Sequence, residues 1–284
     1  MTEADMSLKL MYITNRADVA LIAEACGVDR IFVDMEFIGK EERQPGDTVK
    51  SSHTLDDVKR VREALIKSEL LVRVNPMVED RREYCSAAEE IDGVIAAGAD
   101  VIMLPMAKSA NDVRKFAECV GDRAKTMLLL ETAEAADKID EILSLGVIDE
   151  VHIGLNDLHL SLGKKFMFEL LVDGTVEKLC HKIAAYGLPY GFGGIARIGY
   201  GMLPSEYIIA EHYRLGSGAA ILSRSFANVN NVTDIDEISE IFKLETAKIR
   251  SFEKKLEKYS AEEFEKNKAL TAELVREICE RIKG

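Results

Sequence analysis

The sequence predicts a (β/α)₈ barrel, the TIM-barrel fold, followed by a C-terminal helical extension. Three observations support this. The chain has 284 residues, which is a usual length for a single barrel of this kind. Short apolar runs alternate with amphipathic stretches over residues 8–226. Eight of these runs are almost continuously apolar, as expected for strands of a parallel sheet buried on both faces.

Each expected strand is a short run rich in β-branched or other apolar residues. The runs cover residues 8–14, 30–36, 69–75, 100–106, 125–131, 150–155, 189–194 and 218–223. Helical stretches such as "SANDVRKFAECV" lie between them, and Gly27, Gly98 and Gly146 stand where a helix should end before the next strand. The first strand–helix turn has no Gly-x-Gly-x-x-Gly, which disfavours an open dinucleotide-binding sheet.

The pattern changes beyond residue 230, so we expect a barrel domain over 1–230 and a helical hairpin over 231–284. Apolar residues recur there at close to seven-residue spacing, from Ile238 to Tyr259. The "SAEE" at 260–263 predicts a capping box that opens a second helix. A narrow apolar stripe of this kind packs either on the barrel of its own chain or on a partner subunit, and a homo-oligomer is one expectation.

Composition limits the function classes. The formal net charge is −13 without a long basic cluster, which argues against nucleic acid or an anionic membrane as a partner. The N-terminus lacks signal-peptide character and no apolar run is long enough to span a bilayer. Five scattered cysteines show no zinc spacing, so reduced thiols in a cytoplasmic protein are expected.

Acidic residues close two neighbouring strands of the predicted barrel. Glu131 ends the fifth expected strand and Asp157 the sixth, so both should lie at the rim that carries active sites in this fold. Two carboxylates with water and substrate oxygens suit Mg²⁺ or Mn²⁺. Each could instead be a helix N-cap or first-turn acid.

Further charged residues are expected at the same rim. Arg73 ends the third strand inside an apolar run, where a lone charge needs a partner. Its guanidinium could clamp an anion or stabilise charge that grows on an oxygen. Asp34 and Glu36 end the second strand and add two more carboxylates.

Several blocks of the sequence resemble the HpcH/HpaI aldolase and citrate lyase β-subunit family. They are "GVDRIFVDMEF", "LLVRVNP", "GADVIMLPMAKSANDV", "LLLETAEAADKIDEIL" and "GVIDEVHIGLNDLHLSLG". The resemblance covers about residues 8–226 and implies a barrel of the phosphoenolpyruvate/pyruvate superfamily. It also implies a divalent metal on Glu131 and Asp157 and a pyruvate-like 2-oxo acid whose enolate Arg73 stabilises. Backbone amides of Gly154, Leu155, Asn156 and Asp157 would receive the substrate carboxylate.

The sequence departs from this family at one position. The aldolase branch carries His after its Asp-x-Glu and the citrate lyase branch carries Asp, whereas this chain has Phe37 in "DMEF". The following loop, "IGKEERQPGDTVKSSHTLDD", is longer than in short aldolases and offers His53. His159, two residues after Asp157, is the other candidate to carry a proton. His152 lies inside a strand and is expected to be buried.

Two arginines are candidates for substrate recognition farther from the metal. Arg197 follows the glycine-rich seventh strand and Arg224 follows the eighth, where barrels often bind anions. The glycines could merely serve tight turns.

No lysine occupies a strand end and Lys108 lies in a loop, which disfavours a Schiff-base aldolase. The expected function is a metal-dependent lyase that joins or splits a 2-oxo acid and an aldehyde. The alternatives are a citrate- or malyl-CoA-lyase-like Claisen enzyme acting on an acyl-CoA, and an altered barrel that serves as a binding subunit.

Overall fold

The computed structural model describes residues 7–40, 53–79, 81, 84–227, 229 and 232–282. Its strands form a closed parallel barrel in chain order, and β8 pairs back onto β1. The (β/α)₈ fold expected from the sequence is therefore confirmed. The strands are β1 (Lys9–Ile13), β2 (Arg30–Asp34), β3 (Glu69–Arg73), β4 (Val101–Leu104), β5 (Lys125–Leu130), β6 (Glu150–Ile153), β7 (Tyr190–Ile195) and β8 (Ala219–Leu222).

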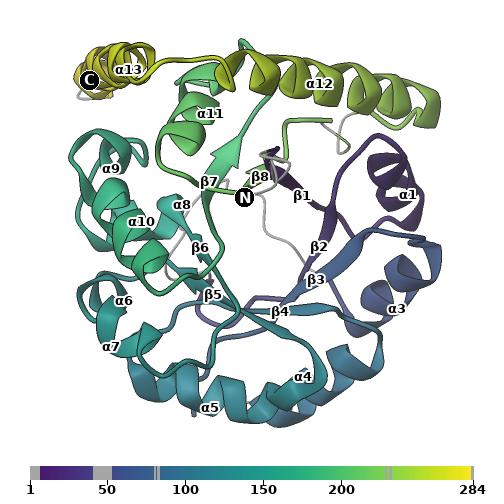
Figure 1. Cartoon of the computed structure of the whole chain (residues 1–284). Coiled ribbons are helices and arrows are strands. Elements are labelled where there is room, and N and C mark those ends of the chain that lie inside the picture. The colour runs from purple at the N-terminus through teal and green to yellow at the C-terminus, as the bar shows by residue number, and fades with distance from the viewer. Residues whose placement is uncertain are drawn as a thin grey trace.

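Helices surround the barrel as an outer ring (Figure 1). Thr54, Ser86 and Ser109 each begin a helix with a reciprocal capping box, which satisfies backbone donors that a helix start leaves unpaired. The helices are α1 (Ala17–Ala25), α3 (Leu55–Ala64), α4 (Ala87–Ala96), α5 (Ala110–Val120), α6 (Ala133–Asp137), α7 (Ile139–Leu143), α8 (Leu155–Ser161), α9 (Glu169–Val172), α10 (Thr175–Ala185), α11 (Ser205–Arg214), α12 (Ile235–Leu256) and α13 (Ala261–Arg281), with a 3₁₀ turn at Gly121–Arg123.

Most strands end earlier than the apolar runs suggest, and this changes the place of Asp157. Strand β6 ends at Ile153 because Gly154 leaves the extended conformation (φ −81°, ψ 87°) and α8 begins at Leu155. Asp157 therefore lies in the first turn of α8 and does not end a strand. An acid is favourable there because the helix dipole is positive at that end.

Apolar side chains form two layers separated by the strands. The larger core fills the space between strands and helices, with buried side chains such as Phe116, Phe192 and Phe226. A smaller cluster fills the barrel interior, as is usual for a closed barrel of this size. Its buried members are Met11, Phe32, Leu71, Val101, Met103, Met127 and Leu129.

Charged side chains close the floor of the barrel, where the strands begin. Arg30 at the start of β2 is fully buried. Its Nη1 and Nη2 donate to the two oxygens of Glu150 at 2.9 Å each, and its Nε and Nη2 donate to Glu69 at 3.1 and 2.6 Å. Lys125 and Lys9 add ion pairs to Glu69 at 2.7 and 3.3 Å. All the donor nitrogens of Arg30 are thus bound by carboxylates.

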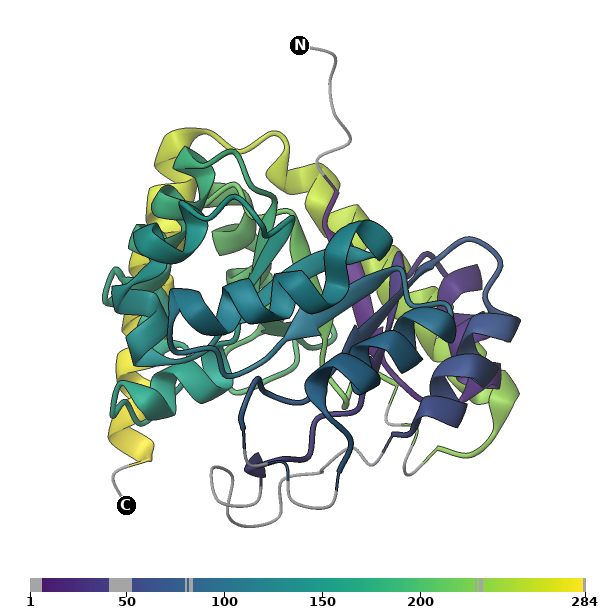
Figure 2. The ribbon, with the colours of Figure 1, turned by 90° about the horizontal axis from the view of Figure 1, so that it is seen from below.

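The two C-terminal helices each pack on the barrel of the same chain. α12 lies against α1 and α11, whereas α13 turns away and lies against α11 and α9 (Figures 1 and 2). Each helix thus lies on the barrel of its own chain, which is one of the two placements expected for the apolar stripe. Phe242 of α12 is fully buried and meets Tyr12 edge-on at 4.9 Å. The expected capping box at Ser260 and Glu263 opens α13 and is confirmed.

None of the described helices is long and apolar enough to cross a bilayer. The long loop expected after the second strand lies largely outside the described residues, because positions 41–52 fall there.

Candidate active site

The site is organised around Asp34, the last residue of β2, whose side chain is fully buried. Arg73, at the end of neighbouring β3, donates from Nε and Nη2 to the two Asp34 oxygens at 2.8 Å each. The parallel register pairs Asp34 directly with Arg73, so the bidentate contact follows from the barrel itself. Burial opposes ionisation, yet Arg73 and Lys40 hold the pKa of Asp34 far below its usual range. Asp34 thereby fixes the plane of the guanidinium.

Arg73 keeps one nitrogen for another partner. Nε and Nη2 bind Asp34, and Nη2 also lies 3.4 Å from Glu36 Oε2. Among the described residues, Nη1 makes no hydrogen bond. Its guanidinium carbon lies 5.6 Å from the centre of the Phe32 ring, which belongs to the interior apolar cluster. The free edge of Arg73 can therefore bind an anionic oxygen at the barrel mouth.

A buried lysine, which the sequence analysis does not anticipate, joins this cluster. Lys40 is 5% exposed, and its Nζ donates to Asp34 Oδ2 at 2.9 Å and to the Glu36 carbonyl at 3.4 Å. Its Nζ also lies 3.6 Å from Glu36 Oε2. The chain folds back through Gly39, which adopts a positive φ of 71° that favours glycine. In the sequence, Lys40 could have been suspected from the "IGK" turn, which follows a strand that ends on an acid.

Asn75, two residues after β3, fixes the turn that carries Lys40. Its Oδ1 accepts the backbone N–H groups of Phe37 and Ile38, each at 2.9 Å. Its Nδ2 donates to Glu90 of α4 at 2.8 Å and to the Met35 carbonyl at 3.3 Å. The side chain of Asn75 thus supplies hydrogen-bond partners to backbone groups of the loop that would otherwise have none.

Glu131 follows β5 directly and is buried. Burial raises the pKa of Glu131 to about 8, and the charges of Glu36 and Asp157 add to this rise while Arg73 opposes it. The Met106 N–H donates to Oε1 at 3.0 Å. Met106 does so with a φ of 55°, a left-handed conformation that a side chain rarely adopts and that often marks functional sites.

Gly154 gives the Glu131 carboxylate the room it needs. A Cβ at position 154 would lie 2.9 Å from Glu131 Cβ and 3.0 Å from Oε2, closer than side chains approach. The Gly154 N–H donates to the Leu130 carbonyl at 3.0 Å, so this amide is already used. The amides of Leu155, Asn156 and Asp157 stand in the first turn of α8, where a helix leaves its backbone N–H groups without intrahelical acceptors.

The donor set fits a hard divalent cation. Glu131 is a buried carboxylate whose ionisation is disfavoured by two further carboxylates, and a cation between Glu131 and Asp157 would reverse that penalty. Two protein carboxylates with water and substrate oxygens are a usual Mg²⁺ environment. No group of three or more His, Cys, Asp or Glu side chains in the described ranges is placed to hold a metal by itself.

The histidines occupy different environments. His53 lies at the rim, where its Nδ1 accepts the Asp34 N–H at 3.0 Å and burial lowers its pKa. His159 is buried in α8, with Nδ1 3.1 Å from the Leu155 carbonyl. No described contact joins His159 to Arg73 or Glu131. His152 is buried in β6, as expected, with Nε2 3.0 Å from the Gly193 carbonyl.

The two distal arginines differ in their distance from the cluster. Arg224, after β8, lies 3.8 Å from Asp34 Oδ2. Burial lowers the pKa of Arg224, Asp34 opposes this and Arg73 adds to it. Arg197, after β7, donates to the Phe226 carbonyl and lies over the Tyr200 ring. The structure therefore brings Arg224, and not Arg197, to the Asp34 cluster.

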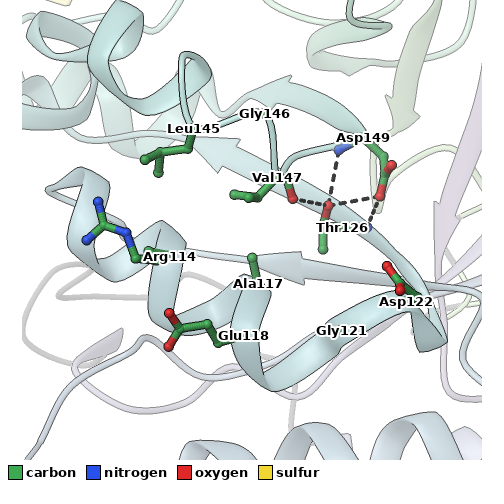
Figure 3. A pocket seen from close by; sticks show the side chains of 10 residues that line it. All are labelled: Arg114, Ala117, Glu118, Gly121, Asp122, Thr126, Leu145, Gly146, Val147 and Asp149. Carbon is green, nitrogen blue, oxygen red and sulfur yellow. Dashed lines mark hydrogen bonds between the residues drawn. The ribbon is translucent and has the colours of Figure 1, made fainter.

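A pocket of about 530 Å³ lies at the opposite end of the barrel, near the start of β5 (Figure 3). Among its lining residues, Thr126 Oγ1 lies 2.9 Å from both the Val147 carbonyl oxygen and Asp149 Oδ2. The pocket includes none of the site residues predicted from the sequence. It is lined by Arg114, Ala117, Glu118, Gly121, Asp122, Thr126, Leu145, Gly146, Val147 and Asp149.

Comparison with known proteins identifies the family. The sequence model of the HpcH/HpaI aldolase/citrate lyase family matches residues 9–169, which is more than half of the chain. This protein belongs to the HpcH/HpaI aldolase/citrate lyase family. Its family and fold are those of an aldolase- or citrate-lyase-type enzyme. Asp34, together with Lys40 and Arg73, whose side chains contact its carboxylate, lies inside the matched region, whereas Arg224 lies outside it.

Solved structures of the HpcH/HpaI family share the fold. One is an HpcH/HpaI aldolase from Desulfitobacterium hafniense DCB-2, 20% identical, with a TM-score of 0.57 over 77% of this chain and 86% of that one. Another is a HpcH/HpaI aldolase/citrate lyase family protein from Burkholderia cenocepacia J2315, 15% identical, with a TM-score of 0.60 over 82% and 95%. A comparison with curated proteins finds no significant match.

Phe37, where the resemblance leads one to expect His or Asp, is not part of the polar cluster in this HpcH/HpaI chain. Its side chain is 49% exposed and meets Tyr84 edge-on at 4.9 Å. Position 37 therefore supplies no group that could carry a proton.

Proposed function

We propose that this protein is a class II aldolase or lyase that uses Mg²⁺ or Mn²⁺ to make or break a C–C bond through the enolate of a pyruvate-like 2-oxo acid. The observation that carries the proposal is the division of charge at the barrel mouth. On one side Asp34 holds Arg73 through two hydrogen bonds, and Arg73 Nη1 has no hydrogen-bond partner in the described part of the chain. On the other, Glu131 and Asp157 form an acidic pair that suits a cation.

Each group of the site has a separate role in enolate formation. A divalent cation bound by Glu131 and Asp157 would act as a Lewis acid toward the 2-oxo group. Arg73 would donate from Nη1 to the oxygen on which negative charge grows, and its fixed plane means that little reorganisation is needed during the reaction. Asp34 positions Arg73 through the bidentate contact. The amides of Leu155 to Asp157 would receive the substrate carboxylate.

The contacts of Lys40 disfavour a Schiff-base route. Imine formation requires the amine nitrogen to attack a carbonyl carbon. Lys40 Nζ lies 2.9 Å from Asp34 Oδ2 and 3.6 Å from Glu36 Oε2, so this nitrogen is already engaged with two carboxylates. The same contacts that place Lys40 in the site therefore oppose its use as an imine-forming nucleophile.

Exchange of the methyl protons of pyruvate in D₂O tests this function without knowledge of the aldehyde. We expect exchange that requires Mg²⁺ or Mn²⁺, that stops after chelation and that returns when metal is added back. Exchange of acetyl-CoA methyl protons in place of those of pyruvate would favour the Claisen alternative. The absence of exchange with either compound would favour a binding subunit and overturn the proposal.

A further inference from the structure

Lys40 lies close enough to Arg73 to serve the same reacting molecule. Lys40 Nζ and Arg73 Nη2 both bind Asp34 Oδ2, at 2.9 and 2.8 Å. They are therefore no more than 5.7 Å apart, the sum of those two distances. They also share Glu36 Oε2, at 3.6 and 3.4 Å. Two cations and two carboxylate oxygens thus alternate in one small ring.

The ammonium of Lys40 retains a donor. An ammonium has three N–H groups, and within the described part of the chain two of them make hydrogen bonds, to Asp34 and to the Glu36 carbonyl. The turn around Gly39 is fixed by Asn75, so the position of Nζ is set before any substrate binds.

His53, the other proton-bearing group on Asp34, is unsuited to accept or release a proton. Its Nδ1 accepts the Asp34 N–H, so the neutral ring must carry its proton on Nε2. Such a ring has no lone pair left to act as a base, and to give up the Nε2 proton it would have to become an imidazolate. Lys40 can donate as an ammonium and accept as an amine.

We propose that Lys40 is the acid–base residue that exchanges a proton with the oxygen of the aldehyde partner. This rests on the proposed aldolase function. In the addition direction a bond forms between the enolate carbon and the carbonyl carbon, and the electron pair of the C=O bond moves to oxygen. Lys40 Nζ then gives that oxygen a proton and remains as a neutral amine, which water reprotonates. In the cleavage direction the amine takes the hydroxyl proton as the C–C bond breaks, so the step needs no oxidant or reductant.

The test separates the two half-reactions. Enolisation of pyruvate moves a methyl proton to water with the help of Arg73 and the metal, and it involves no aldehyde oxygen. C–C bond formation requires in addition a proton for the aldehyde oxygen. In Lys40→Met we expect pyruvate methyl exchange to stay within about threefold of wild type. We expect kcat for addition of pyruvate to glyoxylate, glycolaldehyde or propionaldehyde to fall ~10²-fold or more, the scale of general acid–base catalysis.

Lys108→Met is the matched control, because Lys108 lies after β4 with its side chain 61% exposed beside Glu134. It should leave both reactions unchanged. Lys40→Arg keeps the charge and reports on folding: we expect it to retain exchange while addition stays impaired.

Three results would overturn the proposal. An equal loss of exchange and addition in Lys40→Met would make Lys40 a positioning residue for Arg73. Unchanged addition in that variant would remove Lys40 from the reaction. Wild-type protein that exchanges pyruvate protons but adds none of the three aldehydes would show that Lys40 does not give a proton to an aldehyde oxygen. Failure of the proposed function itself would instead appear as the absence of metal-dependent exchange in wild type.

Discussion

The floor and the mouth of the barrel are both built on an arginine between carboxylates, but only one is complete. At the floor every donor nitrogen of Arg30 is bound by Glu69 or Glu150. Although burial raises it, contacts with Lys125 and Arg30 hold the pKa of Glu69 at about 2. At the mouth, Nη1 of Arg73 makes no hydrogen bond to any residue that the structure describes, and burial raises the pKa of Glu131 to about 8. An arginine whose N–H groups are all bound by carboxylates stabilises the fold, whereas an arginine with an unbound N–H group can also bind a ligand.

The largest effect on activity should come from the acidic side of the mouth. Glu131→Gln keeps the shape but removes a charge that a cation needs. Metal-dependent pyruvate exchange should fall by ~10³-fold or more, equivalent to about 4 kcal/mol of barrier. Circular dichroism should show a native fold. Glu134→Gln, half-exposed nearby in α6, is the control and should retain full exchange. Retained metal affinity in Glu131→Gln would refute the metal assignment.

The corresponding change at the floor should affect stability and spare activity. Arg30→Met leaves Glu69 and Glu150 partly buried without their main partner, at a cost of about 3 kcal/mol, measured by urea unfolding. Exchange activity should persist at temperatures where the variant is folded. Lys9→Met, at the more exposed edge of the same cluster, should cost less than about 1 kcal/mol. A loss of activity in folded Arg30→Met would break the distinction between the two ends.

Arg73→Lys tests geometry and not charge, because lysine lacks the planar fork that Asp34 orients. We expect kcat for pyruvate exchange to fall by ~10²-fold, the scale of one preorganised donor, with metal affinity little changed. Equal exchange in this variant and in wild type would remove Arg73 from the mechanism.

Between floor and mouth, His152 in β6 and His212 in α11 are buried as neutral rings. Burial lowers the pKa of His152 to about 4 and that of His212 to about 3. Unfolded histidine binds a proton below about pH 6.5, so the unfolded state gains protons first. The stability that these neutral rings contribute should therefore be full above pH 6.5 and fall as the pH drops toward 4, by about 1–2 kcal/mol per histidine between pH 7 and 5. The raised pKa of Glu131 acts in the opposite direction over the same range, so the histidine contribution is read from the difference between wild type and a variant. His152→Gln should lose about half of this dependence in urea titrations. Equal pH dependence of the unfolding free energy in wild type and in His152→Gln would contradict it.

The sequence predicted the barrel well because its strands have a strong local signature. The site was predictable only in part. Glu131, Arg73 and Asp34 stand at strand ends, so the barrel brings them together. Lys40 reaches Asp34 only because Asn75 and Gly39 fold its turn back, and this depends on hydrogen bonds between Asn75 and residues 37 and 38 positions before it. Asp157 was misplaced because an apolar run does not show where Gly154 ends the strand.

The side chain of Asn75 has a consequence for evolution and engineering. It ties the segment after β2 to Glu90, and Glu90 in turn pairs with Arg81 in the segment after β3. The two loops are thus one cooperative module. Grafting either loop alone into a related barrel should misplace its turn, whereas exchange of residues 35–90 as one cassette should carry the turn, Asn75 and its Glu90 anchor together.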